Sequence, residues 1–310
     1  MKKKVKALLL MSGGLDSMLA AKILQNQGVQ VTPVCFKSFF FDCAMAQKAC
    51  KQLGLKLKEI DFGKKHLAML KAPRFGRGSA INPCIDCHLL MFKEAKKIMK
   101  AEGYDFVATG EVLGERPMSQ NARALELLEK ESGLKGLLLR PLSAKVLPET
   151  SPEKKGLVNR EKLYGISGRG RKAQLELTNQ FHIKEFPTPA GGCILTDKNY
   201  SDNLKILLSF KKNINENDAL IIRQGRVFWE NNVLIVVARD KAESETLKKM
   251  RTKGDLYAEP KNFTGPSVIA RPMKKSSLLE MTSFVKQYLI KYSKQVPAEP
   301  AFTLWTLPKP

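Results

Sequence analysis

The stretch Ser12-Gly13-Gly14-Leu15-Asp16-Ser17 decides the fold of this chain. It follows an apolar run of strand length, residues 5–11, and it opens onto residues 18–24, whose apolar positions have helical spacing. A strand, a glycine-rich turn and a helix in this order bring backbone N–H groups and the positive end of a helix dipole to one point. Gly13 and Gly14 can adopt positive φ and leave room for an anion against the main chain. We therefore predict an anion-binding loop.

The polar side chains of this loop narrow the kind of anion. Ser12 and Ser17 add hydroxyl donors, whereas Asp16 is an unusual neighbour for a bare anion. A carboxylate beside phosphates makes sense where it orients Mg²⁺ or a positively charged group. No Gly-Lys-Ser/Thr follows the glycines, which excludes the Walker phosphate loop. The simplest alternative is an ordinary Gly-Gly turn that is capped by Ser or Asp.

The full motif resembles the SGGxDS pyrophosphate loop of the PP-loop ATPases. That resemblance implies a protein that binds ATP with Mg²⁺ and adenylates an oxygen, releasing pyrophosphate. We expect Asp16 to act in catalysis as well as in binding. The expected ATP-binding residues are Met11, Ser12, Gly13, Gly14, Asp16, Ser17, Phe36 and Gly110.

Length and composition indicate a globular protein with room for two domains. The chain has 310 residues, of which 43% are hydrophobic and 27% are charged. No apolar run reaches the roughly 18 residues of a membrane span. The lysines at residues 2–4 and the apolar run after them could suggest a signal peptide, but the run is short and lacks a small-residue cleavage site. We expect a cytoplasmic protein with no membrane partner.

The net charge points to a polyanionic partner. Lys and Arg total 53 against 30 acidic residues, which gives a formal net charge of +23. Such an excess favours nucleic acid, because ATP alone does not require it. The alternative is a lysine-rich surface without a partner.

Strand and helix signals alternate through the first half of the chain. We predict strands over residues 5–11, 29–36, 56–62, 105–109 and 137–139, and helices over residues 18–24, 39–53, 83–102 and 120–131. This alternation predicts an α/β fold, with a parallel sheet that is flanked by helices on both faces. The fold implied by the loop is that of the adenine nucleotide alpha hydrolase-like PP-loop domains. Ligands of such sheets bind at the carboxyl ends of the strands.

Beyond residue 196 the alternation fades. Short apolar or alternating runs cover residues 218–223, 226–229 and 233–238, with a hairpin-type turn at Asn231-Asn232 before the last run. A helix is expected over residues 242–250. We predict a catalytic domain over residues 1–198 and a smaller α+β domain over residues 199–310 that ends in a proline-rich tail.

Six cysteines in a chain of this kind suggest metal binding or catalysis before a disulfide framework. Three of them are expected to be packed core residues, namely Cys35, Cys43 and Cys50. Cys84 and Cys87 form a Cys-x-x-Cys in the first turn of a helix, where the dipole favours thiolates and the spacing suits two ligands of one metal or cluster.

A third thiol narrows the type of metal centre. Cys193 follows two glycines in a loop. Three cysteines would leave one iron of a [4Fe-4S] cluster without a protein thiolate, free to hold sulfide or substrate. Zinc would need a fourth ligand, for which His88 and His182 are the candidates. Few histidines are present, so Asp16 and Glu111 are the expected polar helpers.

Asn82-Pro83 followed by Cys87 and a helix resembles the N-P-D-x-x-C segment of the MnmA-type tRNA 2-thiouridylases. Cys193 stands in the place of their distal cysteine. In that family both cysteines act in sulfur transfer, and cluster ligation is also described. Cys84 stands where the family has Asp, which favours an all-thiolate cluster. The resemblance implies that Cys84, Cys87 and Cys193 are catalytic and are the metal ligands, in a member of the tRNA thiouridylase (MnmA/ThiI-like) group.

The strand end at residues 105–110 resembles the A-T-G-H segment of the same family, where backbone atoms meet the adenosine. Glu111 replaces the histidine of that segment, so the resemblance carries over a nucleotide contact at Gly110 only.

Basic residues and a second resemblance indicate how RNA is held. The run at residues 168–172 places cations at a helix start, where they are unfavourable unless an external anion compensates. Gly225-Arg226 with residues 257–269 resembles the NFACT-R-type RNA-binding module. Phe228, Trp229 and Phe263 could stack bases there or be core aromatics. The expected RNA contacts are Arg116, Arg169, Arg171, Lys172, Arg226 and Lys261.

These inferences converge on an ATP-dependent tRNA uridine thiolase, a sulfurtransferase. ATP would adenylate a uridine oxygen, and sulfur from inorganic sulfide or a persulfide carrier would then displace AMP. Three alternatives stay open: another PP-loop ligase that resembles lysidine synthetase, a cluster-dependent desulfidase, and a non-enzymatic RNA-binding protein with a structural zinc site. The sequence does not indicate which uridine is modified or the oligomeric state.

Overall fold

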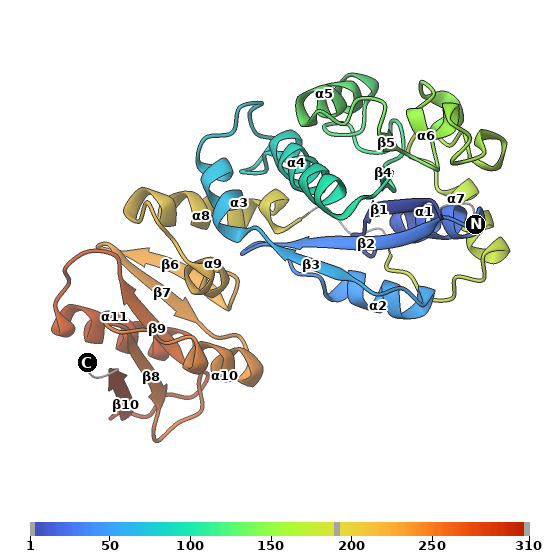
Figure 1. Cartoon of the computed structure of the whole chain (residues 1–310). Helices are drawn as coiled ribbons and strands as arrows, with labels where there is room; N and C mark the ends of the chain where they lie inside the picture. Colours follow the sequence, from blue (N-terminus) through green and yellow to red (C-terminus); the bar gives the residue numbers. More distant parts are fainter. Residues whose placement is uncertain (1–3, 189–192, 307–310) are drawn as a thin grey trace. The chain divides into compact units, whose positions relative to one another are not determined.

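The computed structural model describes residues 4–188 and 193–306. The chain divides into two compact units, Met1–Thr196 and Asp197–Pro310, and each unit is described by itself (Figure 1). Among the described residues, no helix combines the length and the apolar character that crossing a membrane requires.

The first unit is built on a five-stranded parallel sheet. Its strands are β1 (Lys6–Leu10), β2 (Gln30–Lys37), β3 (Lys58–Asp61), β4 (Phe106–Thr109) and β5 (Leu138–Leu139). The spatial order is β3-β2-β1-β4-β5, so the direction of winding reverses between β1 and β4. Ligands bind at such a switch point, outside the carboxyl ends of the strands. The predicted α/β fold is confirmed.

Helices cover both faces of this sheet (Figure 1). On one side lie α1 (Leu15–Gln25), α2 (Ala44–Leu53) and α7 (Lys172–Gln180), and on the other lie α3 (Gly63–Lys71), α4 (Cys84–Glu102) and α5 (Ala122–Ser132). The unit is completed by the short helix α6 (Ser151–Lys154) and by the 3-10 turns η1 (Ala144–Val146), η2 (Arg160–Lys162) and η3 (Ile194–Thr196).

The sequence of the central strand β1 is apolar without alternation because both faces of this strand are buried. Ala7 and Leu9 pack into the core on the α1 side, and Leu8 packs into the core on the α4 side. All three side chains are fully buried. Burial of each leucine side chain stabilises the fold by roughly 1.5–3 kcal/mol. Successive positions can all be buried only in a strand that is covered on both faces.

Several boundaries in the first unit differ from the sequence prediction, and three of the differences have a local cause. Helix α2 begins at Ala44 rather than at Phe39, because Ser38 and Phe41 pair across a tight turn. The strand that was expected up to residue 62 ends at Asp61, whose carboxylate accepts the Gly63 N–H at 2.9 Å. Gly63 thus opens the unpredicted helix α3 instead of only closing a strand. Helix α7 begins at Lys172, beyond the two glycines of the basic run.

The second unit contains a five-stranded antiparallel sheet of order β10-β8-β9-β7-β6. Its strands are β6 (Arg226–Glu230), β7 (Val233–Val237), β8 (Leu256–Pro260), β9 (Val268–Pro272) and β10 (Phe302–Thr306). The predicted hairpin turn is present: Asn231 and Asn232 have φ angles of 43° and 68°, as a two-residue type I′ turn requires.

Four helices complete the second unit: α8 (Lys198–Phe210), α9 (Glu216–Ile221), α10 (Lys241–Lys249) and α11 (Leu278–Lys291). The apolar face of α11 packs against β7, β8 and β9 (Figure 1). The run at residues 218–223 falls mostly in α9, which begins with a capping box between Asn215 and Asp218. The proline-rich tail contains β10, which pairs with β8.

Candidate nucleotide and thiol site

Backbone crowding fixes the first glycine of the loop between β1 and α1. Gly13 has a φ of +81°, and a Cβ at this position would lie 2.3 Å from the Met45 carbonyl carbon and 2.5 Å from the Ala46 nitrogen. Any larger residue would therefore push the start of α2 away and strain its own backbone. The loop and α2 can meet only because residue 13 is glycine.

Hydroxyl groups organise the rest of the loop. The Gly14 N–H donates to Ser12 Oγ at 3.2 Å, and Ser17 Oγ donates to the Gly14 carbonyl at 2.8 Å. Gly14 is the N-cap residue of α1 and provides no capping side chain. The first turn of α1 is therefore left uncovered by a capping side chain, as an anion site at a helix N-terminus requires.

Gly110 follows β4 and packs directly on this loop. A Cβ on Gly110 would lie 2.5 Å from the Asp16 carbonyl carbon and 2.5 Å from the Ser17 nitrogen. The close approach alone demands glycine here, at the strand end next to the switch point. The structure thus places Gly110 beside the loop, while its contact with a nucleotide stays a prediction.

The two remaining predicted ATP contacts differ in position. Met11 is buried beneath the loop, and its sulfur accepts the Ser17 hydroxyl at 3.3 Å. Phe36 is buried in the core on the α4 side of the sheet, with its ring centroid 5.4 Å from that of Phe62. The Phe36 side chain packs inward, so a nucleotide contact at this position would involve its backbone.

The Asp16 carboxylate is the incompletely paired group of the site. Its Oδ1 atom is buried and accepts no hydrogen bond within the part of the chain that the structure describes. Burial raises the pKa of Asp16 above its usual range, and the nearby Arg171, Gln174 and Arg116 side chains oppose that effect. Two arginines on separate segments, Arg171 at the start of α7 and Arg116 after β4, therefore act on one carboxylate beside the loop.

The structure gathers the three predicted thiols into one neighbourhood. Cys84 and Cys87 lie on the first turn of α4, and Cys193 directly precedes η3. Burial raises the pKa of the Cys87 thiol, and the Cys193 and Cys84 thiols raise it further. Burial likewise raises the pKa of Cys193, with a further contribution from Cys84. The Asn82 amide donates to Cys84 Sγ at 3.2 Å.

The thiols are near one another without forming a complete set of ligands. Within residues 4–188 and 193–306, no group of three or more His, Cys, Asp or Glu side chains is arranged to hold a metal ion. This includes His88 and His182, the suggested fourth ligands of a zinc ion. Residues 189–192, which contain the glycines before Cys193, lie outside the described part of the chain.

Arg116 connects the loop with the thiols. Its positive charge lowers the pKa of Asp16 and also opposes the raised pKa of Cys193. The residue is exposed and lies in the segment that follows β4. The charge of Arg116 thus acts on both the predicted nucleotide loop and the predicted thiol centre.

Glu111 and His88 do not have the roles that the sequence suggested. Glu111 is buried and accepts from Arg140 Nε at 2.9 Å, and its other oxygen lies 3.0 Å from His88 Nδ1. Burial alone would raise the pKa of Glu111, but Arg140 and His88 lower it to about 2. Thr109 Oγ1 also donates to this carboxylate. Glu111 is thus a permanently charged anchor and not a proton-transferring helper.

The predicted RNA contacts of the first unit fall into two groups. Arg116, Arg169 and Lys172 are exposed, as a binding surface requires. Arg171, between the last two, is half-buried, and its Nε has no hydrogen-bond partner among the described residues. Sequence reasoning missed this difference because adjacent basic residues look alike until the helix that carries them is placed.

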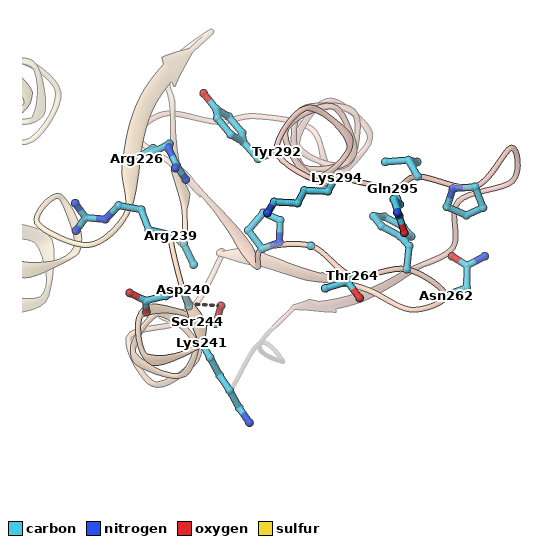
Figure 2. A pocket seen from close by; sticks show the side chains of 16 residues that line it. Arg226, Arg239, Asp240, Lys241, Ser244, Asn262, Thr264, Tyr292, Lys294 and Gln295 are labelled. Atoms are coloured by element: carbon cyan, nitrogen blue, oxygen red, sulfur yellow. Dashed lines mark hydrogen bonds between the residues drawn. The ribbon is translucent and has the colours of Figure 1, made fainter.

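The second unit has a groove of about 1090 Å³ that is lined by basic side chains. Figure 2 shows Arg226 of β6 and Tyr292 toward one side of it, and Asn262 and Thr264 of the β8–β9 loop toward the other. The Arg226 guanidinium lies 5.0 Å from the Tyr292 ring centroid. The basic lining residues are Arg226, Arg239, Lys241 and Lys294, and the acidic one is Asp240.

The three aromatic residues considered for base stacking make contacts within the unit. Phe228 packs on Tyr288 with ring centroids 4.6 Å apart, and Phe263 meets Phe302 edge to face. Trp229 stacks on Phe210, and its indole N–H donates to Asn203. All three aromatic side chains are at least half-buried by contacts within the unit. This burial favours the interpretation that they are core aromatics over the interpretation that they stack on bases. Lys261, in contrast, is exposed.

A glycine loop of the SGGxDS type at the switch point of a parallel sheet is the arrangement of PP-loop nucleotide-binding domains, and the first unit has this architecture. Residues 5–148 match the family model described as tRNA methyl transferase HUP domain. This part of the chain is therefore similar to the PP-loop domains of tRNA-modifying proteins.

Curated relatives match the same part of the chain. The tRNA-specific 2-thiouridylase MnmA of Mannheimia succiniciproducens is 34% identical over 147 residues, which cover 41% of this chain and 36% of the relative. MnmA of Haemophilus influenzae is 32% identical over 135 residues, which cover 38% and 35%. The chain thus spans about a third of the length of the curated relatives it matches.

Solved structures show weaker likeness. The U34-tRNA thiolase NcsA from Methanococcus maripaludis, described with its [4Fe-4S] cluster, is 19% identical with a TM-score of 0.36 and covers 71% of each chain. A 4-thiouridine synthetase in a complex with RNA and bound ATP is 22% identical with a TM-score of 0.38, and covers 58% of this chain and 52% of that one. Similarities this low do not bear on function.

The buried Glu111–Arg140 pair predicts a specific dependence of stability on pH. The folded-state pKa of Glu111, about 2, lies below its ordinary value of 4.5, so its stabilising effect is present above pH 4.5 and is lost as pH falls toward 2. Glu111→Gln removes one of the two carboxylates that pair with buried Arg140 and should destabilise the first unit by about 3 kcal/mol at pH 7, which corresponds to a pKa lowered from 4.5 to about 2. Hydrogen exchange of the β4 amides in urea measures this difference.

The exposed Glu126 on α5 provides the control, because Glu126→Gln removes a carboxylate of the same kind from the surface. We expect the gap between wild type and Glu111→Gln to narrow from pH 5 to pH 3, while Glu126→Gln stays close to wild type. A gap that is absent at pH 7, or that does not change with pH, would contradict the role of Glu111 as a charged anchor.

Proposed function

We propose that this chain is an ATP-dependent tRNA uridine thiolase. One observation carries the proposal: Arg116 influences both Asp16 at the PP-loop and Cys193 in the group of thiols, so nucleotide and sulfur chemistry would share one site. A PP-loop enzyme without sulfur chemistry has no use for three gathered thiols. A site that binds metal only has no use for the PP-loop.

The reaction has two steps. A uridine carbonyl oxygen attacks the α-phosphorus of ATP, and the bond from that phosphorus to the bridging oxygen breaks as pyrophosphate leaves with the electron pair. Hydrosulfide then adds to the activated carbon and loses its proton, and the carbon–oxygen bond breaks as AMP leaves with the oxygen. A protein persulfide in its place would give a disulfide between the carrier and the uridine, whose S–S bond a second thiol then breaks, forming a disulfide with the carrier and releasing the thiouridine. The carbonyl oxygen is a poor leaving group until adenylation makes it part of AMP.

Nucleotide binding would use the Ser12–Ser17 loop. The uncovered first turn of α1 suits phosphate oxygens, and Gly13 and Gly110 keep the neighbouring backbone close. The buried Oδ1 of Asp16 has no partner among the residues that the structure describes and suits Mg²⁺, which binds proteins through one or two carboxylates and the substrate phosphates. A bound cation would also offset the burial that raises the pKa of Asp16.

Sulfur chemistry would use Cys84, Cys87 and Cys193, which we propose as the ligands of a [4Fe-4S] cluster, with zinc as the alternative. The chemistry of the donor set fits, because a bound metal would relieve the repulsion by which Cys84 raises the pKa of both Cys87 and Cys193. When bound, such a cluster would offer one iron without a protein thiolate that could hold sulfide. The Asn82 amide would keep donating to Cys84 Sγ.

Transfer RNA is the proposed macromolecular substrate. The formal net charge of +23 supports a polyanionic partner, and the exposed Arg116, Arg169 and Lys172 lie on the unit that carries the PP-loop. The proposed second contact is the basic groove of the second unit, which Arg226 lines. Exposed Lys261 directly precedes Asn262, another lining residue of this groove. This unit would act as the RNA-binding module that its resemblance to NFACT-R implies.

Asp16→Asn tests the function directly. The substitution keeps the shape of the side chain and removes the charge that would orient Mg²⁺ and the triphosphate. We expect AMP formation and thionucleoside formation to fall by about 100-fold or more, with the fold and metal content retained. Incubation with tRNA, ATP and sulfide, followed by nuclease digestion and mass spectrometry, measures both products.

Glu176→Gln, an exposed carboxylate on α7, is the control for that experiment and should keep wild-type activity. Wild-type rates in Asp16→Asn would remove the PP-loop from the mechanism. Formation of ADP and phosphate in place of AMP and pyrophosphate would exclude adenylation.

Anaerobic purification with iron, sulfide and zinc analysis tests the metal assignment. We expect about four irons per chain with broad visible absorption in the wild type, and loss of both in Cys193→Ala. Cys50→Ala, which changes a buried core cysteine, should retain the iron. One zinc and no iron in the wild type would reject the cluster and favour a structural zinc site.

The salt dependence of tRNA binding tests the groove of the second unit. Replacing Arg226 and Lys294 together by Ala should weaken binding and lower the slope of log affinity against log salt by about 2, one for each lost phosphate contact. A double variant of the exposed Lys205 and Lys253 changes the net charge equally and should leave the slope nearly unchanged. Equal slopes in both double variants would reject the groove as an RNA site.

A further inference from the structure

Three side chains beside the PP-loop, the fully buried Gln174 and the half-buried Asp16 and Arg171, have buried polar atoms without a hydrogen bond among the described residues. Within the described residues, no partner is found for Asp16 Oδ1, for Arg171 Nε, or for either the Nε2 or the Oε1 atom of Gln174. Gln174 is fully buried, with no part of its surface exposed. Burial without partners is costly for each of these groups, because each has lost the water that would otherwise bind it.

These atoms converge on one place. Arg171 is the N-cap residue of α7, and Gln174 lies in the first turn of that helix. Helix α7 packs against α1, which carries Asp16 in its own first turn. Arg171 and then Gln174 are the strongest opponents of the burial that raises the pKa of Asp16. The first turns of two helices therefore present unpaired groups to the same space.

The kinds of atoms left unpaired restrict the ligand. Arg171 Nε and Gln174 Nε2 are donors and suit the oxygens of an anion, whereas Asp16 Oδ1 and Gln174 Oε1 are acceptors and suit a cation or its bound water. A bare metal ion would be repelled by Arg171, and a bare phosphate by Asp16. A phosphate chain that carries a divalent cation offers both kinds of partner.

We propose that Arg171 and Gln174 bind the Mg²⁺-bound triphosphate of ATP, with Arg171 contacting the phosphates that leave as pyrophosphate. This inference rests on the proposed function, because it places both residues at the nucleotide of that same site. It also separates Arg171 from its neighbours: exposed Arg169 and Lys172 are available to RNA, while the Nε of Arg171 is buried.

Arg171 would then act in catalysis as well as in binding. As the uridine oxygen bonds to the α-phosphorus, the bond to the bridging oxygen breaks and negative charge grows on the departing pyrophosphate. A guanidinium held beside that group stabilises the growing charge and can bind two phosphate oxygens at once. Gln174 would fix Asp16 and the hydrated cation on the opposite side of the phosphates.

Nucleotide binding by calorimetry in the presence of Mg²⁺ tests the proposal on the full-length protein. The probes are α,β-methylene-ATP, inorganic pyrophosphate and AMP. Arg171→Ala should weaken the ATP analogue and pyrophosphate by about 10-fold to 100-fold, the loss expected for a hydrogen bond to a charged group, and should leave AMP nearly unchanged. Gln174→Ala should weaken the ATP analogue in the same direction. Arg169→Ala is the matched control and should bind all three probes like the wild type.

A second readout separates a ligand contact from a structural role. The ligand-free protein should lose little thermal stability in Arg171→Ala, because the Nε of Arg171 has no partner among the described residues. Gln174→Ala leaves a cavity in the core and is therefore assessed by nucleotide binding alone. Arg171→Lys keeps the charge but not the planar fork, and it should bind pyrophosphate with an affinity between those of wild type and Arg171→Ala.

The wild-type measurement distinguishes failure of the inference from failure of the proposed function. If the wild type does not bind the ATP analogue, both the inference and the proposed function are rejected. Wild-type binding that Arg171→Ala leaves unchanged would overturn the inference alone, and a matching loss of tRNA affinity in Arg171→Ala and Arg169→Ala would assign Arg171 to RNA instead. Reduced thermal stability of ligand-free Arg171→Ala with unchanged nucleotide binding would make its role structural.

Discussion

The close approach of three backbone segments at the carboxyl edge of the parallel sheet is the constraint on which the site depends. Gly13 lies against the start of α2, and Gly110 lies against the backbone of Asp16 and Ser17. A Cβ would lie 2.3 Å from the nearest backbone atom at Gly13 and 2.5 Å from it at Gly110. Backbone atoms cannot rotate away from such a contact as a side chain can. These contacts bring the loop, α2 and the end of β4 together, and they set the start of α1 beside the switch point.

Two acidic residues near this edge illustrate how surroundings divide structural from functional groups. Glu111 is buried with Arg140 and His88, so its pKa falls to about 2 and its charge is fixed. Asp16 lies near Arg171, Gln174 and Arg116, yet within the described part of the chain one of its oxygens accepts no hydrogen bond, and its pKa is raised. Opposite pKa shifts in neighbouring carboxylates are typical of sites in which one carboxylate stabilises the fold and the other binds a ligand.

The sequence was sufficient for what depends on local pattern. The SGGxDS loop, the strands beside it and the Cys84–Cys87 pair could be placed because their spacing alone constrains the backbone. The Glu111–Arg140 pair could not, since the two residues are 29 positions apart and meet only through the pairing of β4 with β5. The partial burial of Arg171 could not be predicted either, because it depends on the residue at which α7 begins. Strand β10 was missed because a proline-rich tail gives no strand signal before its partner β8 is known.

The fate of the uridine oxygen tests the central claim most directly. Transfer RNA labelled with ¹⁸O at the uridine carbonyl oxygens would be incubated with the wild-type protein, ATP and sulfide in a single turnover, and the AMP would be analysed by mass spectrometry. Adenylation of the uridine predicts one ¹⁸O atom in the phosphate of AMP for each thiouridine formed. AMP without the label, or thiouridine formed without AMP, would contradict the account.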